Sequence, residues 1–345
     1  MERTIDLASL SLAELTDTIV SLGEPKYRAK QLFDWILKGR GFSEMPNLPK
    51  ALIAKLENAG AYVAGMRMAR KLVSSDGTVK YLFETDDGEK IESVLMQYEH
   101  GYTVCISTEA GCAMGCRFCA STLNGLSRRL TPSEMLLQVI RAGNDAGVRI
   151  GGIVLMGIGE PLDNYDNVLK FLRLVGAPEG LNIGYRHISL STCGLVDKID
   201  RLAEEDLPIT LSISLHAADD ETRSALMPVN KKWGIAELLS ACSRYFAKTG
   251  RRISFEYTLV AGKNDGKTQA EKLASVLHTY CQDMPLHVNL IPVNPVTERG
   301  LLPSNREAVA AFAAVLEHRH ITATVRRKLG ADIDASCGQL RAGKK

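Results

Sequence analysis

The feature that most constrains the fold is a regular alternation of strand and helix patterns from residue 102 onward. The expected strands are residues 102–107, 152–156, 187–192, 208–215, 252–259 and 286–292. The helical patterns include residues 132–146, 165–175, 236–248, 267–280 and 305–318. Strands that alternate with helices pair in parallel, because each helix returns the chain to the starting edge of the sheet. The sequence therefore predicts an α/β fold of six βα units, open or partly closed into a barrel.

Alternate positions of these strands are polar, which indicates an open barrel with a polar interior. The polar parity comprises Thr103, Cys105, Ser107, Ser189, Ser191, Ser212, Ser214, His216, Ser254, Glu256, Thr258, His287 and Asn289. The opposite parity is apolar, as at Phe255 and Tyr257, and is expected to meet the helices. Closed eight-stranded barrels instead fill their interior with Val, Ile and Leu. We therefore expect a six-stranded partial barrel that holds a polar ligand.

The chain before residue 99 has a different organisation. Ser11 and Glu14 form a capping box in front of a helical pattern, and two further helical patterns follow before residue 60. Residues 66–73, 78–85 and 90–97 then read as strands joined by short hairpin turns. We expect four parts: a helical accessory domain (1–65), a short antiparallel β extension (66–98), the barrel (99–321) and a C-terminal segment (322–345).

Cys112, Cys116 and Cys119 form a C-x3-C-x2-C run just after the first expected barrel strand. Three thiolates at this spacing can bind three irons of a [4Fe–4S] cluster, which leaves the fourth iron open to a small molecule. Clusters that only carry electrons, and structural zinc sites, normally have four protein ligands. The run therefore favours chemistry at an open metal corner over a zinc knuckle or three unrelated core cysteines.

Composition limits the location and the partners of the protein. No apolar run approaches the roughly 20 residues that span a bilayer. The N-terminus lacks a signal-peptide pattern, and the eight cysteines do not form a disulfide framework, which predicts a reducing cytoplasm. Net charge is only +2, but residues 23–71 hold ten basic and four acidic side chains. This basic strip is expected either to contact phosphates or to be a set of solvated helix faces.

Two cysteines outside the run also lie in unusual surroundings. Cys337 stands among small residues beside Gly338, in a polar tail, and Cys105 is on the polar parity of the first barrel strand. A lone cysteine is usually a small buried hydrophobe. Two that face one polar cavity are more typical of a functional thiol pair.

These residues together resemble the RlmN/Cfr family of radical S-adenosylmethionine (SAM) RNA methyltransferases. The matching segments are residues 23–28, 104–107 with the cysteine run, 156–162, 190–192, 214–217, 227–232, 289–295 and 332–340. The resemblance implies a partial (β/α)6 TIM-like radical SAM barrel with the N-terminal and β additions described above. It also implies that methionine's amino and carboxylate groups occupy the open corner of the cluster. The SAM-binding residues it implies are Gly159, Glu160, Ser191, Ser214, Leu215, His216 and Asn294.

The resemblance also implies a reaction with two SAM molecules per turnover, one as methyl donor and one as radical source. Cys337 takes a methyl group from the first SAM, and the cluster cleaves the second to a 5′-deoxyadenosyl radical. That radical removes hydrogen from the S-methyl group, and the resulting methylene radical adds to adenine. Cys105 then releases the product by forming a disulfide with Cys337. Glu92 matches the family's proton acceptor, although it also suits a solvent-facing strand position.

The implied substrate is an adenosine in 23S rRNA and, in dual-specificity members, an adenosine in tRNA anticodon loops. An electron donor such as flavodoxin or ferredoxin is expected as a further partner. Pro161 is typical of members that methylate carbon 2 of adenine. The alternatives are a carbon-8 methyltransferase of the same family, which confers antibiotic resistance, and a non-catalytic zinc-bound RNA-binding protein.

Overall fold

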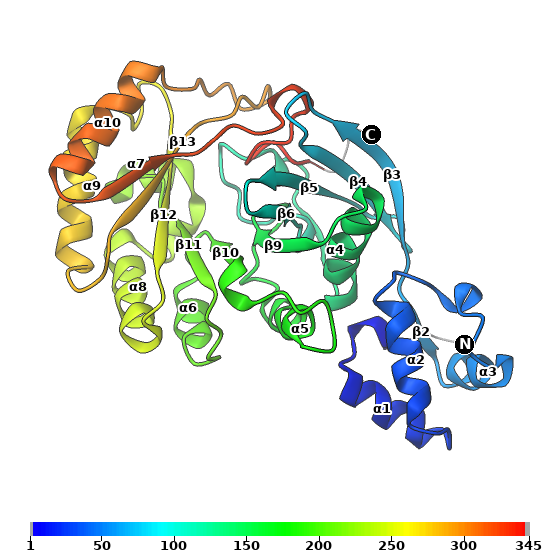
Figure 1. Cartoon of the computed structure of the whole chain (residues 1–345). Coiled ribbons are helices and arrows are strands. Elements are labelled where there is room, and N and C mark those ends of the chain that lie inside the picture. Colours follow the sequence, from blue (N-terminus) through cyan, green and yellow to red (C-terminus); the bar gives the residue numbers. More distant parts are fainter. Residues whose placement is uncertain (1–2, 342–345) are drawn as a thin grey trace.

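Ten strands form one continuous, curved sheet in the computed structural model, which describes residues 3–341 (Figure 1). The strand order is β14-β13-β12-β11-β10-β9-β6-β5-β4-β3. The parallel strands are β6 (Gly101–Cys105), β9 (Ile150–Leu155), β10 (Ile188–Thr192), β11 (Thr210–Ser214), β12 (Ile253–Leu259), β13 (His287–Pro292) and β14 (Thr322–Val325). Crossover helices cover the outer face of this part, so the predicted partial barrel is confirmed.

The crossover helices are α4 (Pro132–Ala146), α5 (Tyr165–Gly176), α6 (Val196–Leu202), α7 (Asp220–Leu226), α8 (Ile235–Thr249), α9 (Lys267–Tyr280) and α10 (Arg306–His318). The short helices α6 and α7 have too few turns to show a clear helical period in the sequence. The structure also adds β14 as a seventh parallel strand, in the segment expected to follow the barrel. It is a short, largely exposed edge strand, so it lacks the apolar pattern of a buried strand.

The antiparallel strands β3 (Met66–Val73), β4 (Val79–Thr85) and β5 (Lys90–Tyr98) form the predicted meander. β5 also pairs with β6, and Val94 lies opposite Cys105 in that register. The meander therefore extends the barrel's own sheet. Both hairpin turns contain a glycine with positive φ, Gly77 and Gly88, as the sequence predicts.

The N-terminal helices pack around a small apolar core of their own, beside the barrel (Figure 1). They are α1 (Leu12–Ser21), α2 (Tyr27–Ile36) and α3 (Lys50–Asn58), and the capping box at Ser11 and Glu14 is present. Two strands, β1 (Ile5–Asp6) and β2 (Ala61–Tyr62), pair in parallel and join the two ends of this lobe. The remaining elements are η1 (Leu7–Ser9), η2 (Phe42–Glu44), β7 (Glu109–Gly111), η3 (Ala120–Thr122), β8 (Leu126–Arg129), η4 (Tyr185–His187), η5 (Pro228–Lys231) and η6 (Ala331–Ile333).

The main core lies between the sheet and the crossover helices. Ile213, Phe255 and Tyr257, on the apolar parity, are fully buried in it. The polar parity faces the lumen, where Ser214, Glu256 and Thr258 line a cavity. This division confirms the predicted polar interior. Within residues 3–341, every helix is too short or too polar to cross a lipid bilayer.

Candidate active site

A cavity opens at the carboxyl ends of the parallel strands, where ligands of βα barrels bind. Its walls combine the cysteine loop after β7, the loop after β9, and the ends of β10 to β13. The C-terminal segment closes one side through Cys337 and Gly338. Residues from widely separated regions of the sequence therefore meet at one site.

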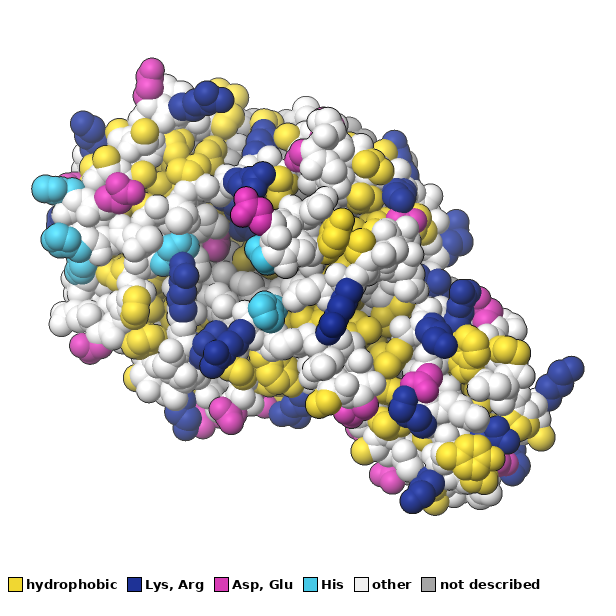
Figure 2. Space-filling model, viewed as in Figure 1, with side chains coloured by type: hydrophobic (Ala, Val, Ile, Leu, Met, Phe, Trp, Pro, Cys, Tyr) yellow, Lys and Arg dark blue, Asp and Glu magenta, His cyan; other side chains and the backbone are white. Residues whose placement is uncertain are grey.

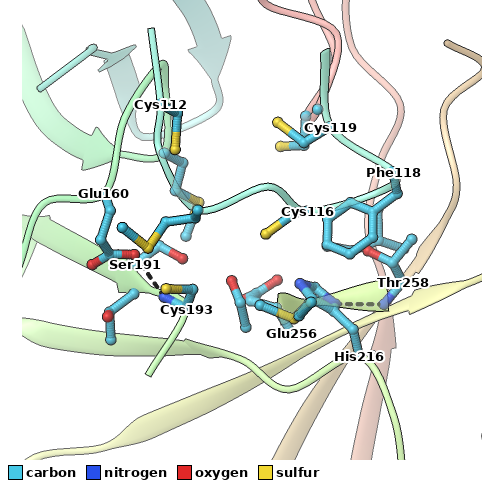
Figure 3. A pocket seen from close by; sticks show the side chains of 18 of the residues that line it. Cys112, Cys116, Phe118, Cys119, Glu160, Ser191, Cys193, His216, Glu256 and Thr258 are labelled. Carbon is cyan, nitrogen blue, oxygen red and sulfur yellow. Dashed lines mark hydrogen bonds between the residues drawn. The ribbon is translucent and has the colours of Figure 1, made fainter. Parts of the chain in front are cut away.

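The three cysteines of the C-x3-C-x2-C run all line this cavity, and Figure 3 shows their side chains directed toward a shared space. The loop begins at the hairpin of β7 and β8, whose close approach requires Gly111: an added Cβ would lie 2.0 Å from the Gly125 carbonyl oxygen. Among the described residues, no three His, Cys, Asp or Glu side chains are placed to chelate a single metal ion.

Burial strongly affects these thiols. It raises the pKa of all three cysteines, and that of Cys112 to about 12. The thiols are therefore neutral at pH 7 unless a bound cationic centre stabilises the thiolates. Three sulfur donors that converge on one cavity, those of Cys112 and Cys116 buried and that of Cys119 partly buried, fit an iron–sulfur cluster.

The loop after β9 packs directly against the start of the cysteine loop. Gly157 and Gly159 permit this contact, because an added Cβ would lie 2.5 Å from the Ile106 carbonyl oxygen and 2.6 Å from Glu109 Cβ, respectively. The buried Glu160 carboxylate accepts hydrogen bonds from the backbone N–H groups of Cys193 (2.8 Å) and Leu162 (3.0 Å). Burial raises the pKa of Glu160 despite these bonds. The carboxylate is thus held rigidly at the cavity wall, where it can accept a ligand ammonium group.

His216 connects the strand ends to the cysteine loop. Its Nδ1 accepts a hydrogen bond from the Thr258 N–H (2.9 Å), and its ring meets Phe118 edge-on at 4.7 Å (Figure 3). Burial lowers the pKa of His216 to about 3, so the ring is neutral. The positive φ of His216 (57°) turns its side chain into the lumen. Thr258 belongs to the polar parity that the sequence predicts to face the lumen, whereas Phe118 is a cavity residue that the sequence reasoning did not single out.

Most of the predicted SAM contacts lie on this cavity, with one exception. Gly159, Glu160, Ser191, Ser214, His216 and Asn294 line it. The Leu215 side chain instead packs in the core behind the sheet. The Leu215 carbonyl accepts a hydrogen bond from Arg223 Nε (3.0 Å), so the structure does not bring this residue to the lumen.

A second cavity adjoins the first, and Cys105 and Cys337 both line it. Cys337 also lines the first cavity, so this thiol borders both. Asn294 Nδ2 donates to the Cys337 carbonyl (3.0 Å) and fixes the backbone there. Burial raises the pKa of Cys105 to about 12. The predicted thiol pair is therefore brought together at one cavity.

Proteins named as RNA methyltransferases are similar to this chain over nearly its whole length. The chain is 51% identical to the probable dual-specificity RNA methyltransferase RlmN of Alkaliphilus oremlandii, over 98% of this chain and 97% of the relative. It is 50% identical to the protein of the same name from Pelotomaculum thermopropionicum, over 98% and 91% of the two chains. The chain belongs to the RlmN family of radical SAM RNA methyltransferases.

Two family models and a solved structure support the assignment to the RlmN family. The radical SAM superfamily model matches residues 106–273, and a model described as the ribosomal RNA large subunit methyltransferase N-terminal domain matches residues 5–61. A crystal structure of a radical SAM methyltransferase from Sphaerobacter thermophilus superposes with a TM-score of 0.92 at 43% identity, covering 99% of this chain and 100% of the other. The predicted family and fold are confirmed. The protein is a SAM-dependent enzyme, and the family implies an iron–sulfur cluster.

Arg326 and Glu256 lie at the junction of the two cavities of this RlmN-family enzyme. Arg326 lines both cavities, and its Nη1 donates to Glu256 Oε2 at 3.3 Å. The negative charge of a Cys337 thiolate raises the pKa of Arg326, whereas burial raises that of Glu256. Glu256 lies on the polar parity that the sequence predicts to face the lumen. No local pattern marks Arg326, because β14 was not expected.

The structure does not place Glu92 on the thiol cavity. Glu92 Oε1 forms an ion pair with Lys80 Nζ (2.9 Å), and Oε2 accepts the Arg341 N–H (2.7 Å). It lines a separate cavity beneath the C-terminal segment. Beside this cavity, Leu340 belongs to a small apolar cluster with Val94 of β5 and Cys105 of β6. Residues 340–341 thus cover Glu92, and the carboxylate is buried instead of facing solvent.

The basic strip (residues 23–71) is partly neutralised by local ion pairs. Lys30, Arg40 and Lys55 pair with Asp34, Glu44 and Glu24, respectively. Exposed Lys and Arg side chains remain on the N-terminal lobe, with acidic side chains among them (Figure 2). The strip also exposes Tyr27, whose ring lies 4.9 Å from the Arg28 guanidinium carbon. An exposed aromatic ring beside a cation suits contact with an unstacked RNA base.

Proposed function

We propose that this enzyme methylates carbon 2 of one adenosine in 23S rRNA and of one in tRNA anticodon loops, through an S-methylated Cys337. The observation that carries the proposal is the position of Cys337, which borders both the cavity of the three cysteines and the cavity of Cys105. A carrier thiol needs access to a methyl donor on one side and to the base on the other. Relatives named as dual-specificity RNA methyltransferases support the two RNA classes.

The first cavity is the SAM site in this proposal. Cys112, Cys116 and Cys119 would hold a [4Fe–4S] cluster, which when bound supplies the electron that cleaves SAM. Glu160 accepts the ammonium group of methionine, and Asn294 holds the Cys337 backbone near the donor. Each turnover consumes two SAM molecules, because methylation of Cys337 and radical formation are separate uses. A small electron-transfer protein such as flavodoxin or ferredoxin reduces the cluster.

The two thiols divide the remaining chemistry. Carbon 2 of adenine is a poor nucleophile, so direct transfer of a methyl cation from SAM is not feasible. Cys337 therefore takes the methyl group and presents it to the base in the second cavity. Cys105 attacks the Cys337 sulfur, so that an S–S bond forms as the bond between sulfur and the transferred carbon breaks. The electron pair of the broken bond stays with that carbon, which takes up one proton to complete the methyl group. The resulting disulfide must be reduced by two electrons before the next turnover.

The second cavity receives the base. Its lining includes the consecutive cations Arg326, Arg327 and Lys328, together with Tyr98. A base reaches such a cavity only if it is unstacked, which favours loops over helices in the RNA. The exposed cations and Tyr27 of the N-terminal lobe add contacts to the surrounding backbone.

The choice of carbon 2 over carbon 8 rests on Pro161 in the Gly-Glu-Pro loop. Nucleoside mass spectrometry of RNA from a host that lacks its own enzyme, complemented with this one, tests it directly. We expect 2-methyladenosine in rRNA and in tRNA. Formation of 8-methyladenosine without 2-methyladenosine would overturn the proposal.

Replacing the two thiols separately tests the mechanism. Cys337→Ala should assemble the cluster but make neither adduct nor product, because it cannot carry the methyl group. Cys105→Ala should be methylated on Cys337, add to adenine and then stall with RNA attached. The purified Cys105 variant should show a nuclease-sensitive mobility shift and a crosslinked peptide that contains Cys337. Normal turnover of the Cys105 variant would return Cys105 to the role of a core residue.

Replacing the cysteine run tests the cofactor. Alanine at any one of Cys112, Cys116 or Cys119 should abolish the iron–sulfur absorbance and reductive cleavage of SAM. Anaerobic reconstitution with iron and zinc analysis gives the readout, with Cys242→Ala, a core cysteine, as the matched control. Zinc without iron–sulfur absorbance in the wild-type enzyme would favour a non-catalytic zinc protein.

A further inference from the structure

Lys80, on β4, is a lysine whose side chain is only 9% exposed. Burying an ammonium group is unfavourable unless partners replace its water, so its contacts are informative. Its Nζ lies 2.9 Å from Glu92 Oε1 and donates to the Asp334 carbonyl at 3.0 Å. One buried cation therefore joins the expected proton acceptor to the segment that carries Cys337.

The same segment is held from both sides of Cys337. Asp334, which Lys80 binds, precedes Cys337 by three residues, and Arg341, whose N–H donates to Glu92 Oε2, follows it by four. Each oxygen of the Glu92 carboxylate thus has its own partner, one from β4 and one from the C-terminal segment. These contacts link the position of the Glu92 carboxylate to the position of the segment that carries the Cys337 thiol.

The turn between β3 and β4 supports this coupling. Ser74 Oγ and the Ser75 N–H donate to the Asp332 carboxylate, and the Gly330 N–H donates to Asp76. Figure 1 shows the C-terminal segment crossing the open end of the barrel to reach β3, β4 and β5. We call this set of contacts the hairpin clasp (residues 74–76 with 330–332). Lys80 follows this turn on β4 and forms the ion pair with Glu92.

We propose that Lys80 is a positioning residue for the Glu92 carboxylate. Glu92 lies on the same face of β5 as Val94, which lines the second cavity, and residues 340–341 cover the carboxylate. When RNA displaces residues 340–341, Glu92 can take the proton from carbon 2, and the ion pair with Lys80 keeps its carboxylate in place for that step. This inference rests on the proposed function. Replacement of a ring hydrogen by a methyl group that left SAM as CH3+ releases one proton from carbon 2, and Glu92 accepts it. Lys80 holds the carboxylate in position through the ion pair between its Nζ and Glu92 Oε1.

The other charged groups around this cavity are Arg70 on β3, and Asp332, Asp334 and Arg341 on the C-terminal segment. Three of these groups, those on the C-terminal segment, have partners other than Glu92 for their side chains. The Arg341 guanidinium pairs with Glu298, the Asp332 carboxylate binds the hairpin clasp, and Asp334 Oδ1 accepts from Gln339. Lys80 is the cation that touches Glu92, so its removal should change the proton affinity of that carboxylate.

The test uses the reconstituted holoenzyme with Lys80→Met, Lys80→Gln and Lys80→Arg. Lys90→Met is the matched control, because Lys90 is an exposed lysine two residues before Glu92 on β5. Single-turnover experiments measure Cys337 methylation by peptide mass spectrometry, the covalent RNA adduct by mobility shift, and methylated RNA by nucleoside analysis, each from pH 6 to about 9.

We expect Lys80→Met and Lys80→Gln to retain SAM cleavage and Cys337 methylation, to accumulate RNA adduct, and to release product about 10²-fold more slowly, as for loss of a general base. The release rate in both should rise with pH over a higher range than in the wild type, because a buried carboxylate without a nearby cation holds its proton more tightly. Lys80→Arg should restore the wild-type pH profile, and Lys90→Met should match the wild type throughout.

Wild-type release rates and an unshifted pH profile in Lys80→Gln would overturn the proposal. A double variant, Lys80→Gln with Glu92→Gln, gives a second test. If it releases product more slowly than Glu92→Gln by the same factor by which Lys80→Gln is slower than the wild type, the two residues act independently and the proposal is overturned. Lys80→Gln keeps a hydrogen-bond donor in the cavity, so the test stands if Lys80→Met fails to fold. The Cys105→Ala variant distinguishes a failure of the proposed function from a failure of this inference. If Cys105→Ala forms no RNA adduct, the proposed function fails. If it forms the adduct but the Lys80 variants behave as the wild type, only the role of Lys80 is rejected.

Discussion

Arg223, on α7, shows at the residue scale how a buried cation holds the strand ends beside the cavity of the three cysteines. Its guanidinium donates to the carbonyls of Leu215 (3.0 Å) and Cys193 (2.7 Å) and to Asn230 Oδ1 (2.9 Å). Cys193 lies directly after β10, Leu215 directly after β11, and Asn230 in the turn after α7. Arg223→Met should leave them unpaired and lower the free energy of unfolding by about 3 kcal/mol or more. Equilibrium urea unfolding of the purified protein measures the change.

Arg244→Met is the matched control for this prediction. Arg244 pairs with Asp200 on the surface, where both side chains are about half exposed. Exposed ion pairs contribute roughly 0–1 kcal/mol, so this variant should unfold almost as the wild type does. Equal effects of the two substitutions would show that Arg223 does not organise the strand ends.

At the scale of elements, the hairpin clasp attaches the C-terminal segment to the β3–β4 turn and should be sensitive to acid. Partial burial acts to raise the pKa of Asp76, but hydrogen bonds from the Gly330 and Thr78 N–H groups outweigh it and hold that pKa well below its usual range. Such a carboxyl stabilises the fold above its unfolded pKa of about 3.9, and this stabilisation is lost as pH falls through the folded value. Asp76→Asn should therefore lower the Tm at pH 7, and its difference from the wild type should shrink progressively below about pH 4.

Thermal unfolding of the two apoproteins between pH 7 and about pH 3 gives the comparison. Asp283→Asn, at an exposed loop position, serves as the control and should have the wild-type Tm throughout. A Tm difference for Asp76→Asn that persists unchanged into acid would mean that its charge is not what holds the clasp.

At the scale of the whole molecule, the N-terminal lobe has its own apolar core and touches the barrel through few polar contacts. Ser133 binds Asp6 and Ser9, and Lys170 pairs with Glu14. Removal of residues 1–60 should therefore leave SAM cleavage intact, while RNA affinity falls and the salt dependence of binding becomes shallower. Binding titrations at several salt concentrations measure both quantities.

A full-length variant keeps that experiment independent of folding. Glutamate at Lys26, Lys38 and Lys50, all exposed on the lobe, should weaken RNA binding, whereas Lys248→Glu on α8 should not. Wild-type affinity and salt slope in both the truncated and the charge-reversed protein would identify the basic strip as a solvated surface.

Local patterns were enough to predict much of this molecule. The bounds of α4 and α9, the three strands of the meander and the lumen-facing parity of Glu256 follow from residue spacing, because side-chain period and turn residues act over a few positions. The spacing of the cysteine run likewise places its three thiols on one loop. Such features need no knowledge of what packs against them.

Other features depended on contacts between distant segments, which no local pattern encodes. β14 is a strand because β13 lies beside it. Lys80 reads as an ordinary strand lysine until the fold brings it to Asp334, 254 residues away. The sequence by itself determined most of the elements, the inward parity and the placement of three cysteines on one loop. Only the tertiary structure decided that Cys337 borders both cavities and that Glu92 is tied to Lys80, because both depend on where the C-terminal segment crosses the barrel.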